Sequence, residues 1–131
     1  MAARSFRWMA GVPTRVWENK DLQSHFNTPV YYKQCIFGTE GPLRCIDPRT
    51  GIVSWTSPDN FEKGGVIAVD GTLIVVMGNT GTIAMVEANP TAYKELGRIK
   101  PLDGQTWTAP IIADGKLFVR NKTQLVCLDL K

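Results

Sequence analysis

Cysteine, histidine and acidic residues are the side chains in this sequence that could bind a metal or take part in catalysis. The chain has 131 residues, with three cysteines (Cys35, Cys45 and Cys127) and one histidine, His25. No Cys-x-x-Cys pair is present for zinc or redox work, and one histidine cannot make a multi-histidine metal site. We therefore expect the cysteines to be reduced and buried, and His25 to lie in a loop or at a rim.

Other catalytic arrangements are also missing from the sequence. There is no Ser-His-Asp order and no pair of carboxylates at acid–base spacing, and the Gly-Asn-Thr-Gly run from Gly78 lacks the lysine and following helix of a phosphate loop. Three acids, Asp47, Glu87 and Asp129, recur 40 and 42 residues apart, and each ends a predicted strand. Turn formation is sufficient to explain an acid at such a position. We predict no catalytic residue, no metal and no cofactor.

Composition excludes further classes of function. Hydrophobic residues make up 44% of the chain and charged residues 21%, and no run approaches the roughly 20 apolar residues of a membrane span. The net charge is +3, and the 15 Lys and Arg are spread along the chain, so we expect neither nucleic-acid binding nor membrane insertion. The beginning of the chain lacks the apolar stretch of about 7–15 residues of a secretory signal, which predicts a cytoplasmic location for the sequence as written.

A repeat of about 40 residues positions the three acids. The stretches from Asn27, Gly64 and Thr108 each contain a short apolar strand, a turn, a longer strand rich in β-branched residues, a second turn, and a third strand that ends on the acid. Asp70-Gly71 and Asp114-Gly115 are typical two-residue hairpin turns, and glycine pairs 38/41 and 78/81 punctuate the second hairpin. The spacing is that of a propeller blade, a four-stranded antiparallel meander.

The repeat predicts an all-β fold of about three β-propeller blades. We place the blades at 26–57, 65–100 and 107–131, with an N-terminal arm or tail at 1–12. Because the third repeat stops before a fourth strand, we expect residues 14–18, ending in Trp17, to be an outer strand that completes the last blade. Asn89-Pro90 and Gly97 flank a segment with helix start and stop signals, which predicts one or two helical turns at about 90–96.

The first repeat ends in a turn followed by a tryptophan, Cys-Ile-Asp-Pro-Arg-Thr-Gly-Ile-Val-Ser-Trp over residues 45–55. Asp47 can accept hydrogen bonds from the turn amides, Thr50 can close the turn with its hydroxyl, and Gly51 tolerates a left-handed backbone. Trp55, on the outer strand, is wide enough to lie between one blade and the next and bury on the order of 200 Å². We predict that these four residues dock blade to blade.

This spacing, D-x-x-T-G-x-x-x-W with the small Cys45 two residues before the acid, resembles the tryptophan-docking repeat of the pyrroloquinoline-quinone (PQQ)-like β-propellers. That family includes quinoprotein alcohol dehydrogenases and BamB-like outer-membrane assembly proteins, and its full-length members are often periplasmic or envelope-associated. The resemblance covers about residues 13–131. The second repeat departs from it, because Val-Glu-Ala-Asn-Pro-Thr-Ala-Tyr stands in place of the aspartate, the Thr-Gly and the tryptophan.

The resemblance implies three functions, and the residues leave all three open. The one we favour is a non-catalytic scaffold or assembly module that binds protein. The alternatives are a part of a quinoprotein dehydrogenase, whose adjacent cysteines and metal-binding acids we cannot match here, and a propeller that binds a small ligand or carbohydrate at its channel mouth. Aromatic and arginine side chains dominate protein interfaces, so the candidate partner contacts are Trp8, Arg44, Phe61, Trp107 and Arg120.

Three blades are too few to close a ring, since propellers typically have about four to eight. We therefore expect either further copies of the chain, with a dimer of six blades as the first choice, or a place in a longer propeller. The partner is accordingly a protein or the chain itself.

Overall fold

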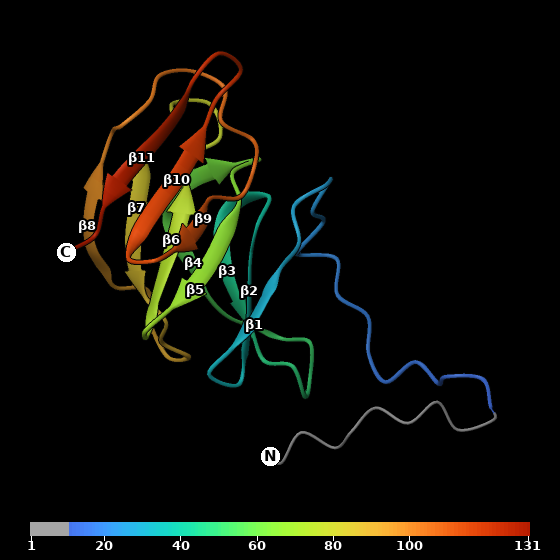
Figure 1. The fold of residues 1–131 in the computed structure, drawn as a ribbon. Helices are drawn as coiled ribbons and strands as arrows, with labels where there is room; N and C mark the ends of the chain where they lie inside the picture. Colours follow the sequence, from blue (N-terminus) through green and yellow to red (C-terminus); the bar gives the residue numbers. More distant parts are fainter. Residues whose placement is uncertain (1–10) are drawn as a thin grey trace.

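The computed structural model describes residues 11–131, and in this part of the chain all regular structure is β-strand. The strands form three antiparallel sheets that lie side by side (Figure 1). Within residues 11–131 no helix is long and apolar enough to cross a membrane. The predicted fold class, all-β with propeller-type sheets, is confirmed. Trp8 and most of the predicted arm lie outside the described residues.

Each sheet is a meander in which neighbouring strands follow one another in the chain. The first sheet contains β1 (Val30–Tyr32), β2 (Cys35–Thr39), β3 (Gly41–Ile46) and β4 (Val53–Glu62). The second sheet contains β5 (Val66–Val69), β6 (Thr72–Val76), β7 (Ile83–Glu87) and β8 (Glu95–Ile99). The third sheet contains β9 (Ile111–Ala113), β10 (Lys116–Arg120) and β11 (Leu125–Asp129).

A two-residue turn with positive φ at both positions joins the first two strands of every sheet. Asp70-Gly71 has φ of 46° and 78°, and Asp114-Gly115 has 52° and 69°. These values are those of the hairpin turn whose twist matches the flanking strands. In the first sheet the same turn is made by Lys33 and Gln34, with φ of 47° and 62°. This turn carries no glycine, so the sequence pattern did not reveal it.

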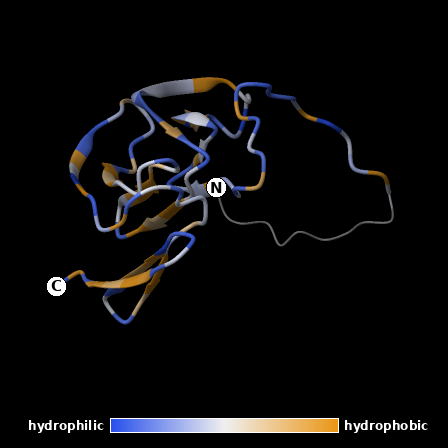
Figure 2. Ribbon diagram, turned by 90° about the horizontal axis from the view of Figure 1, so that it is seen from above, coloured by the Kyte–Doolittle hydropathy of each residue, from blue (hydrophilic) through white to orange (hydrophobic). Residues whose placement is uncertain are grey.

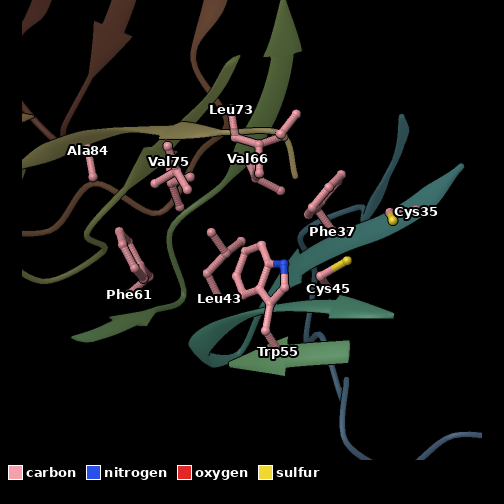
Figure 3. Close-up of a cluster of buried hydrophobic side chains, with 12 residues drawn as sticks. Cys35, Phe37, Leu43, Cys45, Trp55, Phe61, Val66, Leu73, Val75 and Ala84 are labelled. Carbon is pink, nitrogen blue, oxygen red and sulfur yellow. The ribbon is translucent and has the colours of Figure 1, made fainter. Parts of the chain in front are cut away.

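Neighbouring sheets bury apolar side chains between them. We call the side of a sheet that faces the next sheet in the chain its forward face, and the opposite side its backward face. The forward face of the first sheet packs on the second sheet through Phe37, Leu43, Cys45, Trp55 and Phe61, as Figure 3 shows. A second cluster joins the second and third sheets through Ile74, Val76, Ile83, Leu102, Leu117 and Val119. Alternation along β6 supplies both clusters, because successive side chains point to opposite sides.

The turn after β3 contains the acid of the tryptophan motif. The backbone N–H of Arg49 donates to Asp47 Oδ1 at 2.8 Å, and the N–H of Gly51 donates to the Asp47 carbonyl at 2.8 Å. The Ile52 N–H donates to Thr50 Oγ1 at 3.2 Å, and Gly51 has a φ of 74°. The turn therefore returns the chain into β4, where Trp55 pairs with Cys45.

Trp55 lies between the first and second sheets. Its side chain is 8% exposed, its ring centroid is 5.9 Å from that of Phe37 and 5.7 Å from that of Tyr93, and its Nε1–H donates to the Asn89 carbonyl at 2.6 Å. Asn89 belongs to the turn that follows β7. The tryptophan of one sheet is thus anchored on the turn of the next.

The prediction that residues 14–18 form the outer strand of the last blade is wrong for the single chain. They form no strand and do not complete the third sheet of their own chain. Trp17 instead lies on the turn of the first sheet, where its Nε1–H donates to the Pro48 carbonyl at 2.8 Å. The physical reason is distance, because the second sheet packs between the first sheet and the third.

The helical turns expected at about 90–96 are also absent from the described structure. Residues 90–94 have no regular structure, and β8 begins at Glu95. The Glu87 N–H donates to the Lys94 carbonyl, as the Asp47 N–H does to Ile52 in the first sheet. The segment is therefore a lengthened form of the same turn, because pairing of β8 with β7 outweighs the local helix signals.

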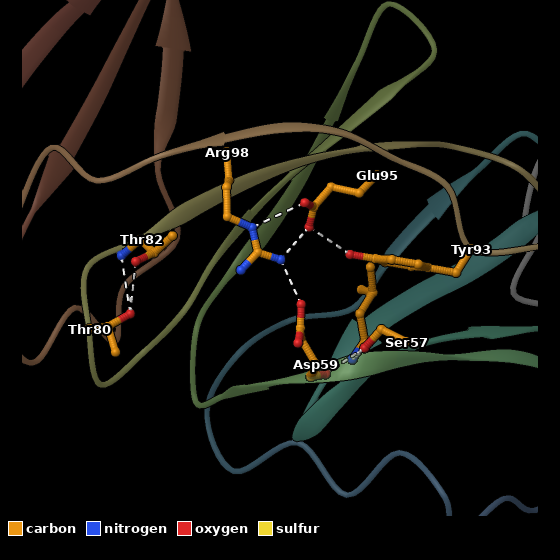
Figure 4. A network of polar contacts seen from close by, with 8 residues as sticks. Ser57, Asp59, Thr80, Thr82, Tyr93, Glu95 and Arg98 are labelled. Atoms are coloured by element: carbon orange, nitrogen blue, oxygen red, sulfur yellow. Dashed lines mark hydrogen bonds and ion pairs between the residues drawn. The ribbon is translucent and has the colours of Figure 1, made fainter.

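A polar network crosses the outer edge of the first and second sheets (Figure 4). Arg98 on β8 donates to Glu95 Oε1 at 2.5 Å and to Asp59 Oδ2 on β4 at 2.6 Å. The Tyr93 hydroxyl donates to Glu95 at 3.0 Å. Burial, with the Glu95 hydrogen bond second, raises the pKa of Tyr93 to about 12. The network adds a charged contact to the apolar one made by Trp55.

Candidate binding surface

A hollow of about 430 Å³ opens where the three sheets begin. The segments that lead into β1, β5 and β9 line this hollow, so all three sheets contribute to it. Its walls are mainly apolar and are formed by Phe26, Asn27, Thr28, Pro29, Val30, Gly65, Val66, Ile67, Trp107, Thr108 and Ala109. The sequence repeat explains this arrangement, because the same part of each repeat reaches the same end of its sheet.

Two aromatic rings and a cation stand at the rim of this hollow. Phe26 is 58% exposed, and its ring centroid is 5.8 Å from that of Trp107. The Lys63 Nζ atom lies 4.8 Å from the centroid of the Trp107 ring, within the range of a cation–π contact. Trp107 Nε1–H donates to Asn79 Oδ1 at 3.3 Å. The indole is therefore held in place from two directions while part of it remains accessible.

Close backbone packing fixes the floor of the hollow. A Cβ atom at Gly65 would collide with the backbone of Ala109, so only glycine lets β5 approach the segment before β9 this closely. The Thr106 N–H donates to the Gly78 carbonyl at 2.8 Å, and Asn27 Nδ2 donates to the Lys63 carbonyl. These contacts join segments of all three repeats, so the hollow is preformed.

His25 lies in the loop before β1 beside Phe26, which agrees with the prediction of a loop or rim histidine. Its Nδ1 atom is 3.4 Å from Glu40 Oε1, and its ring stacks on that of Phe26 with centroids 6.4 Å apart. The side chain is 60% exposed. His25 thus extends the aromatic surface of Phe26 toward a carboxylate.

The predicted partner contacts lie in different places. Trp107 is at the rim of the hollow, and Arg120 is exposed beside a smaller hollow of about 130 Å³ that Trp107 also borders. Arg44 is half-buried on β3, where its guanidinium donates to the Glu40 carbonyl at 3.4 Å. Phe61 is fully buried between the first and second sheets, so its assignment as a partner contact is wrong. The sequence placed Phe61 in a connection between blades, but it lies in the long strand β4, which runs to Glu62.

Phe26 and Lys63 were missed because their roles depend on residues far away in the sequence. Lys63 meets Trp107 across 44 positions, and Phe26 meets it across 81. The only local indication is that each lies just before the first strand of its sheet. An alignment of the three repeats would have placed these residues at the same end of their sheets.

The acids of the repeat lie at the ends of strands, and the buried thiols lie in the core. Hydrogen bonding from the Arg49 side chain holds the pKa of Asp47 below its usual value, and Lys94 does the same for Glu87. Burial raises the pKa of the Cys45 thiol to about 12. Among residues 11–131, no group of three His, Cys, Asp or Glu side chains could hold a metal ion. Cys35 and Cys45 are buried as expected, whereas Cys127 is exposed on β11, the edge strand of the third sheet as the structure describes it.

Comparison with known proteins gives structural matches but no sequence match. No protein-family model and no curated protein sequence matches the chain. The fold is similar to that of the quinohemoprotein alcohol dehydrogenase ADHIIG from Pseudomonas putida HK5, with a TM-score of 0.63 and 16% identity over 80% of this chain. The chain spans 19% of the length of that enzyme.

Two computationally designed proteins match less well. Ika8 has a TM-score of 0.35 and 11% identity over 70% of this chain and 41% of its own. Ika4 has a TM-score of 0.41 and 8% identity over 92% of this chain and 100% of its own. The likeness to the dehydrogenase shows the fold alone: three antiparallel sheets that fit a part of its propeller.

Proposed function

We propose that this chain is a non-catalytic propeller segment that binds a partner protein at the hollow between Phe26 and Trp107. The observation that carries the proposal is an accessible aromatic pair at the rim of an apolar cavity that three sheets hold in shape. Large aromatic side chains in preorganised sites contribute most of the binding energy in protein interfaces.

The charges at the rim indicate the chemistry of the partner. Lys63 lies over the Trp107 ring and supplies a positive charge beside the apolar wall. A partner segment with an apolar side chain for the hollow and an acidic residue for Lys63 would fit both features. The side of the hollow formed by Pro29, Val30 and Val66 would then contact the apolar side chain.

Selection of displayed peptides against the full chain tests this proposal. We expect enrichment of segments that combine an apolar residue with an acidic one, and at least a tenfold loss of affinity for the selected peptide in Trp107→Ala. Tyr31→Ala is the matched control, because Tyr31 is 62% exposed but lies outside the hollow. Circular dichroism checks that both variants fold. Equal binding by wild type and Trp107→Ala would refute the proposal.

A small ligand or carbohydrate is the second candidate for the same hollow. Its volume of about 430 Å³ falls within the range of about 300–1,000 Å³ usual for ligand pockets, and aromatic walls suit sugar rings. Titration of the chain with a panel of oligosaccharides, followed by tryptophan fluorescence, tests it. A saturable change that Trp107→Ala abolishes would favour this candidate over protein binding.

The remaining alternative, a part of a quinoprotein dehydrogenase, is supported by the sequence resemblance and by the fold. Incubation of the chain with the quinone and calcium, followed by desalting, gives a direct test. Visible absorbance retained with the protein would support that alternative, and its loss would leave binding as the function.

A further inference from the structure

Within the described residues, the forward face of the third sheet is uncovered. Leu117 and Val119 of β10 pack toward the second sheet, so Phe118 between them points to the opposite side. On that side Ile111 is 64% exposed and Leu125 is 69% exposed, and Cys127 is also exposed. Figure 2 shows the strands near the C-terminus as largely hydrophobic.

Strand register shows what occupies this place in the first sheet. Phe37, the third residue after its hairpin turn, pairs with Val30 and Cys45, and Phe118, the third residue after its turn, pairs with Ile111 and Cys127. Cys127 is therefore the equivalent of Cys45. Cys45 has Trp55 on β4 as its further neighbour, whereas β11 is the edge of the third sheet as described.

Trp17 repeats the docking of Trp55 without a sheet behind it. The Trp55 indole N–H donates to a carbonyl in the turn after β7, and the Trp17 indole N–H donates to the Pro48 carbonyl in the turn after β3. The Trp17 ring also packs on Gly51, where an added Cβ atom would lie 2.5 Å from Trp17 Cε3. Trp17 thus stands where the tryptophan of a preceding sheet would stand.

The residues before Trp17 have the features of a strand that lacks its sheet. Val12 is 91% exposed and Val16 is 84% exposed, and residues 12–18 pair with no strand in the part of the chain that the structure describes. The residues after Trp17 are fixed to the first sheet, because Asn19 Nδ2 donates to the Gly51 carbonyl and Leu22 packs on Gly38. The segment is therefore anchored at one end and presented to an outside sheet.

We propose that β11 of one copy of this chain takes residues 13–18 of a second copy as its fourth strand, with Trp17 opposite Cys127. A second copy is required because Trp17 lies on the first sheet, with the second sheet between it and β11 (Figure 1). The same contact made in both directions joins two copies into a ring of six sheets. This number falls within the range of about four to eight blades that close a propeller. The inference goes beyond the proposed function, because this contact involves an edge and a face that do not line the hollow.

The register gives a sharp test by cross-linking. In the first sheet Arg44 pairs with Thr56 and Cys45 pairs with Trp55, so Val126 is expected opposite Glu18 of the second copy. The variant Glu18→Cys with Val126→Cys, in a Cys127→Ser background, should form a covalent dimer on mild oxidation. Thr14→Cys with Val126→Cys, in the same background, is the control and should remain uncross-linked. Equal cross-linking of both pairs, or of neither, would overturn the proposal.

Sedimentation of the unmodified full chain gives an independent test. We expect a species of twice 14.5 kDa, and in Trp17→Ala at least a tenfold weaker association. Circular dichroism reports whether Trp17→Ala is folded, and the cross-linking result decides if it is not. A 14.5 kDa monomer at the highest soluble concentration, or an open series of larger oligomers, would contradict a closed pair. Either result leaves the peptide-binding test at Trp107 unaffected.

Discussion

The forward faces of the first and third sheets carry a phenylalanine and a cysteine in the same register, but within residues 11–131 only the first face is covered. Phe37 and Cys45 are fully buried under the second sheet, whereas the equivalent Phe118 is half-buried and Cys127 is exposed. This difference shows that a three- or four-stranded sheet of this fold does not bury its own apolar face. Burial comes from the next sheet and from the tryptophan on the outer strand.

The same substitution in the two sheets should have very different costs. Phe37→Ala removes a fully buried ring and should lower the free energy of unfolding by about 3–5 kcal/mol. Phe118→Ala removes a half-buried ring, so we expect a loss of less than half as much. Urea unfolding at a concentration where the chain is monomeric measures both. Equal losses would show that the third sheet is covered in the monomer.

Two glycines with the same backbone conformation isolate the contribution of Trp17. Gly51 and Gly104 have φ of 74° and 72°, but only Gly51 has a ring against it. Left-handed strain should cost about 1–2 kcal/mol in either alanine variant. Gly51→Ala should cost about a further 1–3 kcal/mol because it displaces Trp17. If thermal unfolding finds the two variants alike, Trp17 does not cover the first sheet.

The turn between β1 and β2 should be improved by glycine. Gln34 is exposed and has a φ of 62°, a conformation that costs a side-chain-bearing residue about 1 kcal/mol. Gln34→Gly should therefore raise the free energy of unfolding by about that amount, toward the Asp-Gly turns of the other sheets. Lys116→Gly is the control, because Lys116 lies in strand β10, where glycine should lower the free energy of unfolding. A lower stability of Gln34→Gly would contradict the turn geometry.

Acid should weaken the ion pair between Glu95 and Arg98 on β8, the arginine that also reaches Asp59 of the first sheet. The Arg98 hydrogen bond holds the pKa of Glu95 below its usual 4.5, so its contribution is fully present above pH 4.5 and is lost as pH falls through the lower folded value. The pair is partly exposed, which limits the effect to less than about 1 kcal/mol. Arg98→Gln should flatten the dependence of stability on pH in this window. An unchanged slope would show that the pair of Glu95 and Arg98 does not contribute to stability.

The general architecture could be predicted from the sequence because it depends on local patterns. Asp70-Gly71 and Asp114-Gly115 specify hairpins by themselves, and the acid spacing specifies the repeat. What could not be predicted depends on tertiary contacts. Phe61 is buried between the first and second sheets, Trp17 bonds to the Pro48 carbonyl of the first sheet, and β8 pairs with β7 directly after segment 90–94. The rim of the hollow brings together Phe26, Lys63 and Trp107, whose separation in sequence hides their proximity.

Hydrogen exchange of the tryptophan indole protons tests most directly whether Trp55 docks the first sheet on the turn of the second. In a chain labelled with ¹⁵N-tryptophan, the Trp55 indole proton should exchange slowly, because it is bonded to the Asn89 carbonyl in a buried place. The Trp107 indole proton, with a longer bond at the exposed rim, should exchange much faster. Exchange of Trp55 as fast as that of Trp107 would contradict docking between the sheets.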